Sequence, residues 1–332
     1  MHVLYACDDK FVWLMGTSMI SLFENNKRIK DLDVYVIGKE LSEKSRNELI
    51  LLGDKYSRNI EILDFPALNI PETLCSERWP LISFARLFAA ELLPDTIDKA
   101  LYLDSDTIVC GDISALDDIE MEDNIFCGVR DCIGEKYRRN IGLTKDDLYI
   151  NAGVILLNIK KLRSMDVRPY LEKTAWEYKD FITYADQDLL NTSFKGYIGE
   201  IPPKYNIMTI VASYSLDRIE KLRRPEMYYT AEELEEAKKD PRIIHYTTNM
   251  LTVRPWYQNT NHPYAEEFIK CLAISPWEDR DLTQMKFSGK KHKIMKLLSF
   301  LPTTISDRTL GFLHAEIRPQ IAKLKAKRII HG

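Results

Sequence analysis

Glycine is scarce in this sequence, and none of it forms a dinucleotide-binding motif. Only 13 of the 332 residues are glycine, and no G-x-G-x-x-G follows the first apolar segment. That motif lets the backbone approach a pyrophosphate closely at the start of a helix. Its absence argues against an NAD-dependent enzyme.

Paired cysteines and long apolar runs are also missing. The six cysteines show no C-x-x-C spacing, so reduced thiols are expected rather than disulfides or zinc ligands. No apolar run approaches the length of a membrane span, and the start MHVLYACDDKF does not read as a signal peptide. We therefore expect an enzyme-sized cytoplasmic protein.

The charge is distributed unevenly along the chain. Residues 286–332 hold eleven Lys or Arg and two acidic residues, which gives +9, whereas the other 285 residues hold 35 basic and 48 acidic residues, which gives −13. Basic residues in this tail alternate with apolar ones, and two short amphipathic helices are expected there. Pro319 is expected to break or restart the helical stripe. We expect a boundary near residue 275, with the region 276–332 following a domain of residues 1–275.

Short apolar segments alternate with stretches long enough for helices. This pattern is typical of an α/β protein with a mostly parallel sheet that helices cover on its faces. Ligands of such sheets bind at the carboxyl ends of the strands, where Asp8, Asp9 and Asp104 are expected to converge. The expected strands are 2–7, 32–38, 59–64, 99–104, 124–131, 151–158 and 242–246, and the expected helices include 42–56, 82–93 and 185–194.

Two aspartates follow the strongly apolar strand in KALYLDSDTIV. Four Asp-x-Asp triplets occur in the sequence, so the triplet alone is weak evidence, but uncompensated carboxylates are costly next to a core. A bound cation would compensate Asp104 and Asp106. Two alternatives stay open at this point: a loop capped by the carboxylates, and a haloacid-dehalogenase-like phosphatase with Asp104 as nucleophile and Asp106 as acid/base.

Six segments together resemble the glycosyltransferases of family 8, a group that includes bacterial lipopolysaccharide galactosyl- and glucosyltransferases and glycogenin. The likeness is greatest to the lipopolysaccharide α-1,4-galactosyltransferase type. It implies a GT-A type nucleotide-diphospho-sugar transferase fold with a single mixed, mostly parallel sheet and a basic helical C-terminal tail. The matching segments, in family order, are YACDD (5–9), SFARLFAAELLP (83–94), ALYLDSDTIV (100–109), NAGVILLNIKKLR (151–163), ADQDLLN (185–191), and IIHY with RPW (243–246 and 254–256).

The resemblance implies a metal site and a UDP site. Asp104, Asp106 and His245 are the implied metal ligands, and this set suits Mn²⁺ better than Mg²⁺, which is the second candidate. Asp8 is implied to contact uracil, and Arg254 to neutralise the departing diphosphate. The loop HYTTNMLTVRPW lacks the family's glycine, and Asn249 is expected to take over phosphate contacts there. The implied nucleotide-binding residues are Ala6, Asp8, Asp9, Lys10, Arg86, Asp104, Ser105, His245, Asn249 and Arg254.

The resemblance also implies a sugar site and a retaining reaction. Gln187 is a poor covalent nucleophile, so we favour a front-face route in which Gln187 stabilises an oxocarbenium-like transition state and an oxygen of UDP takes the acceptor proton. Asp186 and Asp131 complete the expected catalytic set, whereas Asp188 reads equally well as a helix cap. The implied sugar-binding residues are Arg86, Asp131, Asn151, Ala152, Gly153, Asp186 and Gln187.

These expectations describe a hexosyltransferase that takes galactose or glucose from a UDP-sugar to a glycan or glycolipid acceptor, such as lipopolysaccharide. A non-catalytic sugar-nucleotide-binding protein is the alternative from another class. The basic tail favours an anionic membrane surface on the cytoplasmic side as partner. Nucleic acid is not expected, because the rest of the chain is acidic.

Overall fold

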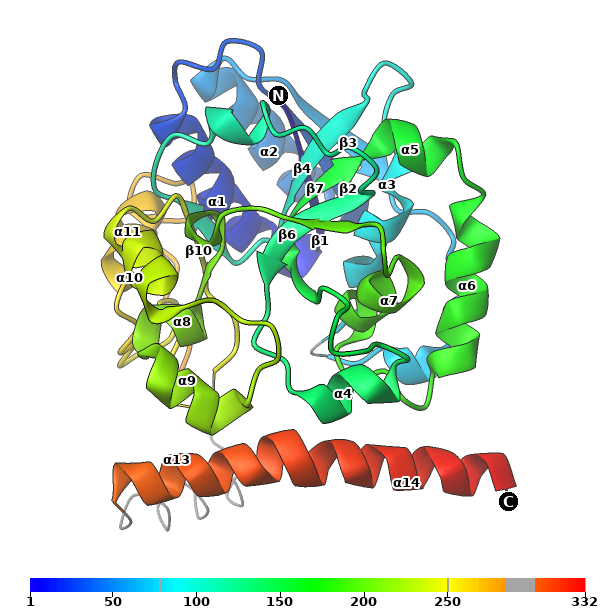
Figure 1. Ribbon diagram of the computed structural model, residues 1–332. Coiled ribbons are helices and arrows are strands. Elements are labelled where there is room, and N and C mark those ends of the chain that lie inside the picture. Colours follow the sequence, from blue (N-terminus) through cyan, green and yellow to red (C-terminus); the bar gives the residue numbers. More distant parts are fainter. Residues whose placement is uncertain (78, 250, 285–301, 332) are drawn as a thin grey trace.

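The computed structural model describes residues 1–77, 79–249, 251–284 and 302–331, and a central seven-stranded sheet organises the chain (Figure 1). Neighbouring strands are parallel except in the pairs β4–β7 and β6–β7. A mixed, mostly parallel sheet with flanking helices confirms the predicted α/β class. Six of the seven expected strands lie in this sheet, and the seventh, 242–246, lies in a second sheet. The strand order of the central sheet is β3 (Ile60–Asp64), β2 (Asp33–Lys39), β1 (His2–Asp8), β4 (Lys99–Leu103), β7 (Ile150–Asn158), β6 (Phe126–Arg130) and β8 (Ile198–Glu200).

A second sheet of three strands corrects the expectation of a single sheet. Its order is β5 (Thr107–Val109), β10 (Ile243–His245) and β9 (Ile207–Met208). After β4 the chain turns at residues 104–106 and leaves the central sheet, and β5 then pairs antiparallel with β10, with His245 opposite Thr107. The turn that carries the two aspartates therefore joins the sheets, and the pairing brings His245 beside it.

Helices cover both faces of the central sheet (Figure 1). Ser42 begins α2 as predicted, because its hydroxyl accepts the N–H of Ser45. The expected helix 82–93 is a 3₁₀ helix, η3 (Leu81–Phe88), followed by one α-helical turn, α3 (Ala89–Leu92). The other helices up to residue 272 are η1 (Asp9–Phe11), α1 (Val12–Asn25), α2 (Glu43–Tyr56), η2 (Glu72–Leu74), η4 (Ser114–Leu116), α4 (Glu135–Asn140), α5 (Ile159–Arg163), α6 (Val167–Tyr178), α7 (Ala185–Ser193), η5 (Pro203–Tyr205), α8 (Thr209–Ser213), α9 (Leu216–Arg223), α10 (Ala231–Lys239) and α11 (Ala265–Leu272).

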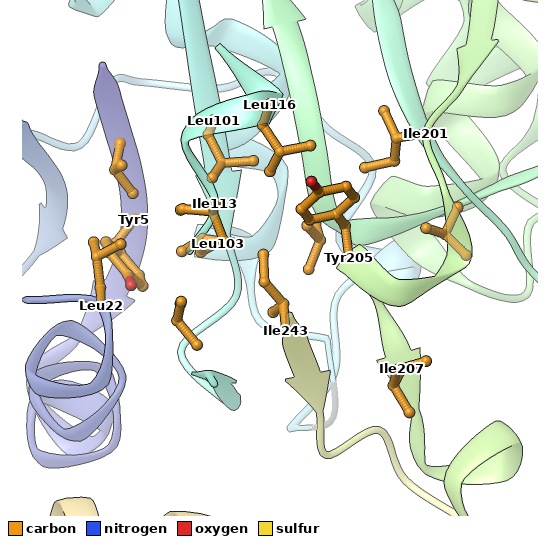
Figure 2. Packing of buried hydrophobic residues seen from close by; sticks show 14 of the residues in the cluster. Tyr5, Leu22, Leu101, Leu103, Ile113, Leu116, Ile201, Tyr205, Ile207 and Ile243 are labelled. Atoms are coloured by element: carbon orange, nitrogen blue, oxygen red, sulfur yellow. The ribbon is translucent and has the colours of Figure 1, made fainter. Parts of the chain in front are cut away.

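The largest core cluster holds the two sheets and α1 together. Figure 2 shows Leu103 of β4 between Tyr5 of β1 and Ile243 of β10, with Leu22 of α1 on one side and Tyr205 of η5 on the other. All five side chains are buried. Burial of each large apolar side chain contributes roughly 1.5–3 kcal/mol to the stability of the fold. This packing holds β4 in place directly before the turn at residues 104–106.

The C-terminal segment is helical from Thr303 to His331 and lies along α9 and α4 (Figure 1). It consists of α13 (Thr303–Gly311), the π-helical turn η6 (Phe312–Ile317) and α14 (Arg318–His331). Pro319, where the helical stripe was expected to break or restart, lies in the first turn of α14, directly after the π turn. The tail residues 286–301 lie outside the described residues. Within the described part of the chain, no helix has the length and hydrophobicity needed to span a membrane.

Candidate active site

Two carboxylates and an imidazole meet at the junction of the two sheets. His245 Nε2 lies 3.1 Å from Asp106 Oδ1 and 3.6 Å from Asp104 Oδ2. One potential ligand atom from each side chain falls within 4.8 Å of the others, so the three residues can hold a metal ion. Burial alone would lower the pKa of His245, but Asp106 and Asp104 outweigh burial and raise it. A cation between the carboxylates would replace the proton that they attract.

The second ring nitrogen of His245 is held by Asn206. Asn206 Oδ1 lies 3.2 Å from Nδ1 and accepts a hydrogen bond from it, which directs Nε2 toward Asp104 and Asp106. Asn206 Nδ2 in turn donates to Asn151 Oδ1 over 2.9 Å. Asn206 is fully buried, and the sequence analysis missed it because the segment PKYNIM carries no recognisable motif.

Gly153 makes room for the metal ligands. A Cβ at this position would lie 2.1 Å from His245 Cε1 and 2.6 Å from Asp104 Oδ2, both far inside van der Waals contact. The Gly153 carbonyl also accepts the backbone N–H of Asp104 over 2.7 Å. The backbone of β7 therefore forms one wall of the cluster.

Arg86 pairs with one oxygen of Asp104, and the other oxygen faces His245. Its guanidinium pairs with Asp104 Oδ1 at 2.8 Å, with Asp186 Oδ2 at 3.2 Å, and stacks 4.2 Å from the ring of Tyr102. Arg86 is 4% exposed, so these partners compensate a buried charge. Burial raises the pKa of Asp186 to about 6, and Arg86 opposes the shift.

A hydrogen-bond network orients Gln187 beside this cluster. Its Oε1 accepts from Asn151 Nδ2 at 2.9 Å, and its Nε2 donates to Asp131 Oδ2 at 2.9 Å and to Tyr149 Oη at 3.1 Å. Ala185, at the start of α7, has a φ of 45° in the left-handed region, which turns the chain just before Asp186. Strain of this kind is often found at functional sites.

The ligand cluster lies in a pocket of about 560 Å³. Two of the predicted residues do not line it. Asp9 instead accepts the backbone N–H and the hydroxyl of Ser42, and the Lys10 side chain is exposed. The predicted residues that do line it are Ala6, Asp8, Arg86, Asp104, Ser105, Asp106, Asp131, Asn151, Ala152, Gly153, Asp186, Gln187, His245, Asn249 and Arg254.

Part of the pocket wall was not predicted. Trp79 and Tyr184 face each other with ring centroids 6.2 Å apart, and Arg223 of α9 lines the wall with His314 and Arg318 of the C-terminal helix. The sequence analysis treated the C-terminal region as separate from the site, and no local motif links residue 318 to residue 223.

The comparisons with known proteins agree with this geometry. The family model described as Glycosyl transferase family 8 matches residues 2–260. The chain belongs to glycosyltransferase family 8. It is 26% identical to the lipopolysaccharide 1,2-glucosyltransferase of Escherichia coli (strain K12), over 88% of this chain and 84% of the relative. It is 23% identical to general stress protein A of Bacillus subtilis (strain 168), over 83% and 94% of the two chains.

Solved structures show the same fold. The galactosyltransferase LgtC, crystallised with donor and acceptor sugar analogs, superposes with a TM-score of 0.69 at 24% identity, covering 88% of this chain and 99% of that one. Glycosyltransferase GlyE of Streptococcus pneumoniae TIGR4 gives a TM-score of 0.59 at 23% identity, over 84% and 62% of the two chains. The chain is therefore a glycosyltransferase of the GT-A fold.

Proposed function

We propose that this chain is a metal-dependent, retaining hexosyltransferase that moves galactose or glucose from a UDP-sugar to a glycan acceptor such as lipopolysaccharide. The convergence of Asp104, Asp106 and His245 on one face of a nucleotide-sized pocket carries the proposal. Family membership and the lipopolysaccharide 1,2-glucosyltransferase relative support the reaction class and the type of acceptor.

The ligand set fits a divalent cation, with Mn²⁺ favoured over Mg²⁺ because an imidazole accompanies the carboxylates. When bound, such a cation neutralises the charge that builds up on a departing diphosphate. Three features prepare the site. Asn206 keeps His245 Nε2 directed at the carboxylates, Arg86 and Tyr102 hold Asp104 Oδ1, and Gly153 leaves the space open.

Arg254 is the cation we assign to the leaving group. Its Nη1 lies 3.6 Å from Asp106 Oδ2, its guanidinium stacks 4.6 Å from the ring of Trp256, and it lines the pocket. Asn249 lines the same wall, and we propose it as a phosphate contact. Asp8 and Ala6, in β1, are proposed to contact the uracil, with Ser105 as a further candidate for the nucleotide, whereas Asp9 and Lys10 lie outside the pocket.

On the sugar side, we assign Gln187 to stabilising an oxocarbenium-like transition state. Both donors of its amide are engaged by Asp131 and Tyr149, and its oxygen accepts from Asn151 and from the Ala152 N–H. A side chain held in this way, and weakly nucleophilic, suits a front-face reaction better than a covalent glycosyl-enzyme. Asp186 and Asp131 are proposed to contact sugar hydroxyls.

The test is release of UDP from UDP-galactose, UDP-glucose and UDP-GlcNAc, with and without Mn²⁺. We expect metal-dependent release from one donor and a loss of about a hundredfold or more in Asp106→Ala. Asp118→Ala removes an exposed carboxylate elsewhere and should leave turnover unchanged. Release of phosphate from small phosphoesters without any UDP release would favour the phosphatase alternative, and donor binding without turnover would favour a binding protein.

We also propose that the enzyme works at the cytoplasmic face of a membrane through its basic C-terminal region. The +9 charge of residues 286–332 and the exposed apolar side chains of the C-terminal helix support this assignment.

A further inference from the structure

Two arginines from distant parts of the chain line the same pocket, outside the proposed donor site. Arg223 is the last residue of α9, and Arg318 is the first residue of α14. Both line the pocket, together with His314 of η6. The body of the protein and its C-terminal helix therefore each contribute one guanidinium to the same wall.

This wall adjoins the proposed sugar site. His314 Nε2 accepts a hydrogen bond from Arg223 and lies 3.4 Å from the hydroxyl of Tyr184. Tyr184 immediately precedes α7, which carries Asp186 and Gln187. The charges of both arginines act on the same two phenols, Tyr137 and Tyr184. A group bound there would lie next to the sugar that is to be transferred.

Neither arginine forms an ion pair with a carboxylate of the described residues, although arginines close by do. Arg218 of α9 pairs with Asp307 at 2.8 Å, and Arg224 pairs with Glu316 at 2.9 Å, and both carboxylates belong to the C-terminal helix. The helix thus neutralises arginines along its contact with the body. Arg223 donates to His314 and is attracted by Asp131 from beyond ion-pair distance, so both pocket-lining guanidinium groups remain able to pair with an anion from outside.

The position of Arg318 is set by the docking of the helix. Asn140 of α4 donates to the Pro319 carbonyl over 2.9 Å, directly after Arg318. Gly311 packs so closely on α9 that a Cβ there would lie 1.8 Å from the Lys221 carbonyl oxygen. These contacts fix the backbone of Arg318 beside the pocket before any ligand arrives, and its side chain is exposed.

We propose that Arg223 and Arg318 bind an anionic group, a phosphate or a carboxylate, on the acceptor glycan. The C-terminal helix is then a wall of the acceptor subsite. The planar guanidinium groups suit either anion, because both accept paired N–H donors. This inference rests on the proposed function and adds the chemical class of the acceptor to it.

The experiment is an NMR titration of the full chain, stripped of divalent cations and exchanged into chelator-free buffer, with glucose, glucose 6-phosphate and glucuronate. Removing the cations prevents them from drawing the anions to Asp104 and Asp106. We expect one of the two anionic sugars to bind about tenfold or more tightly than glucose, and the better anion identifies the acceptor group. That advantage should vanish in Arg318→Gln and Arg223→Gln and persist in Arg308→Gln, which removes an exposed charge of the same helix that does not line the pocket.

Equal affinity for glucose and both anionic sugars would overturn the inference. So would an equal loss in Arg308→Gln and Arg318→Gln, since it would assign the effect to the diffuse positive charge of the tail. Thermal unfolding of each variant verifies that the pocket is folded. UDP release is measured separately and needs neither arginine variant, so a failure there counts against the transferase proposal alone.

Discussion

Gly153 lies where the proposed metal ligands approach the backbone of β7, and a larger residue there would displace those ligands. A Cβ would overlap His245 Cε1 at 2.1 Å and Asp104 Oδ2 at 2.6 Å. Neither neighbour can retreat easily. Arg86 and Tyr102 hold Asp104, and Asn206 holds His245.

We therefore predict that Gly153→Ala weakens Mn²⁺ binding by about tenfold to a hundredfold, because it displaces ligands that their neighbours orient. Overpacking should also cost roughly 1–3 kcal/mol in the free energy of unfolding. Electron paramagnetic resonance of free Mn²⁺ measures the affinity. Gly128→Ala is the matched control: its Cβ would lie 2.8 Å from Ile150 Cδ1, so it should destabilise the sheet while keeping the affinity. Equal Mn²⁺ affinity in both variants would contradict this account.

His262 is a buried histidine with a structural role, and burial lowers its pKa to about 4. Its Nδ1 accepts the Tyr264 N–H, and its Nε2 faces the Thr209 hydroxyl at 3.3 Å, so the neutral ring is satisfied. As the pH falls below about 6.5, the unfolded chain takes up the proton before the folded protein does. The stability is therefore lost progressively between about pH 6.5 and pH 4.

At pH 5 this linkage should lower the free energy of unfolding by about 2 kcal/mol relative to pH 7. His262→Gln removes the titrating group. Urea unfolding of both proteins is measured at pH 7 and at pH 5. We expect the free energy of unfolding of the wild type to fall by that amount relative to the variant between the two pH values. A difference that is the same at both pH values would show that His262 is protonated equally in the two states.

At the residue scale, functional side chains that lie within family motifs could be predicted from the sequence. The residues that orient those side chains could not. Asp104, Asp106 and His245 could be proposed because their segments resemble a family in order. Asn206 could not, because it reaches His245 only through the pairing of β9 with β10. Such long-range pairing leaves no local pattern in the sequence.

At the scale of elements, the long strands of the central sheet were predictable, whereas its short strand β8 and the separate second sheet were not. The long strands show continuous apolar runs, which signal buried strands. By contrast β5, β8 and β9 have only two or three residues each, too few for any periodicity. The expected strand 242–246 is β10, but its sequence does not show that it pairs outside the central sheet. The docking of the C-terminal helix was also invisible, since it depends on pairs such as Arg218 with Asp307, 89 residues apart.

Gly311 offers a test of that docking. Gly311→Ala places a Cβ 1.8 Å from the Lys221 carbonyl oxygen, a backbone atom that cannot swing aside. Alanine favours an isolated helix over glycine by about 1 kcal/mol, so the helix itself should not melt. We predict that amide exchange in residues 303–324 becomes at least about tenfold faster, while the central sheet keeps its protection. Thr309→Ala, in the same helix, is the control and should leave amide exchange unchanged. Unchanged exchange in Gly311→Ala would contradict the docking of the helix on α9.

At the scale of the whole molecule, the C-terminal helix packs against the body on one side and presents apolar side chains to the outside on another. Leu310 and Ala315 are buried against the body, whereas Phe312 and Leu313 are each about half exposed, 48% and 47%. The predicted boundary near residue 275 remains a prediction. Packing of the body does continue past it, since Trp277 contacts α1 beside Gly16.

The exposed apolar residues and the basic charge together predict binding to anionic vesicles by the docked helix. Replacing Phe312 and Leu313 by aspartate removes apolar area that the membrane would bury, and it adds negative charge. Partitioning onto phosphatidylglycerol vesicles should therefore fall by about tenfold or more. Ile274→Asp alters an equally exposed apolar residue on the body and should leave sedimentation with vesicles unchanged. Binding by the wild type should weaken with salt, because part of the attraction is electrostatic. Equal sedimentation of the wild type and the double variant would locate membrane contact away from this helix face, and the helix would then serve the acceptor pocket alone.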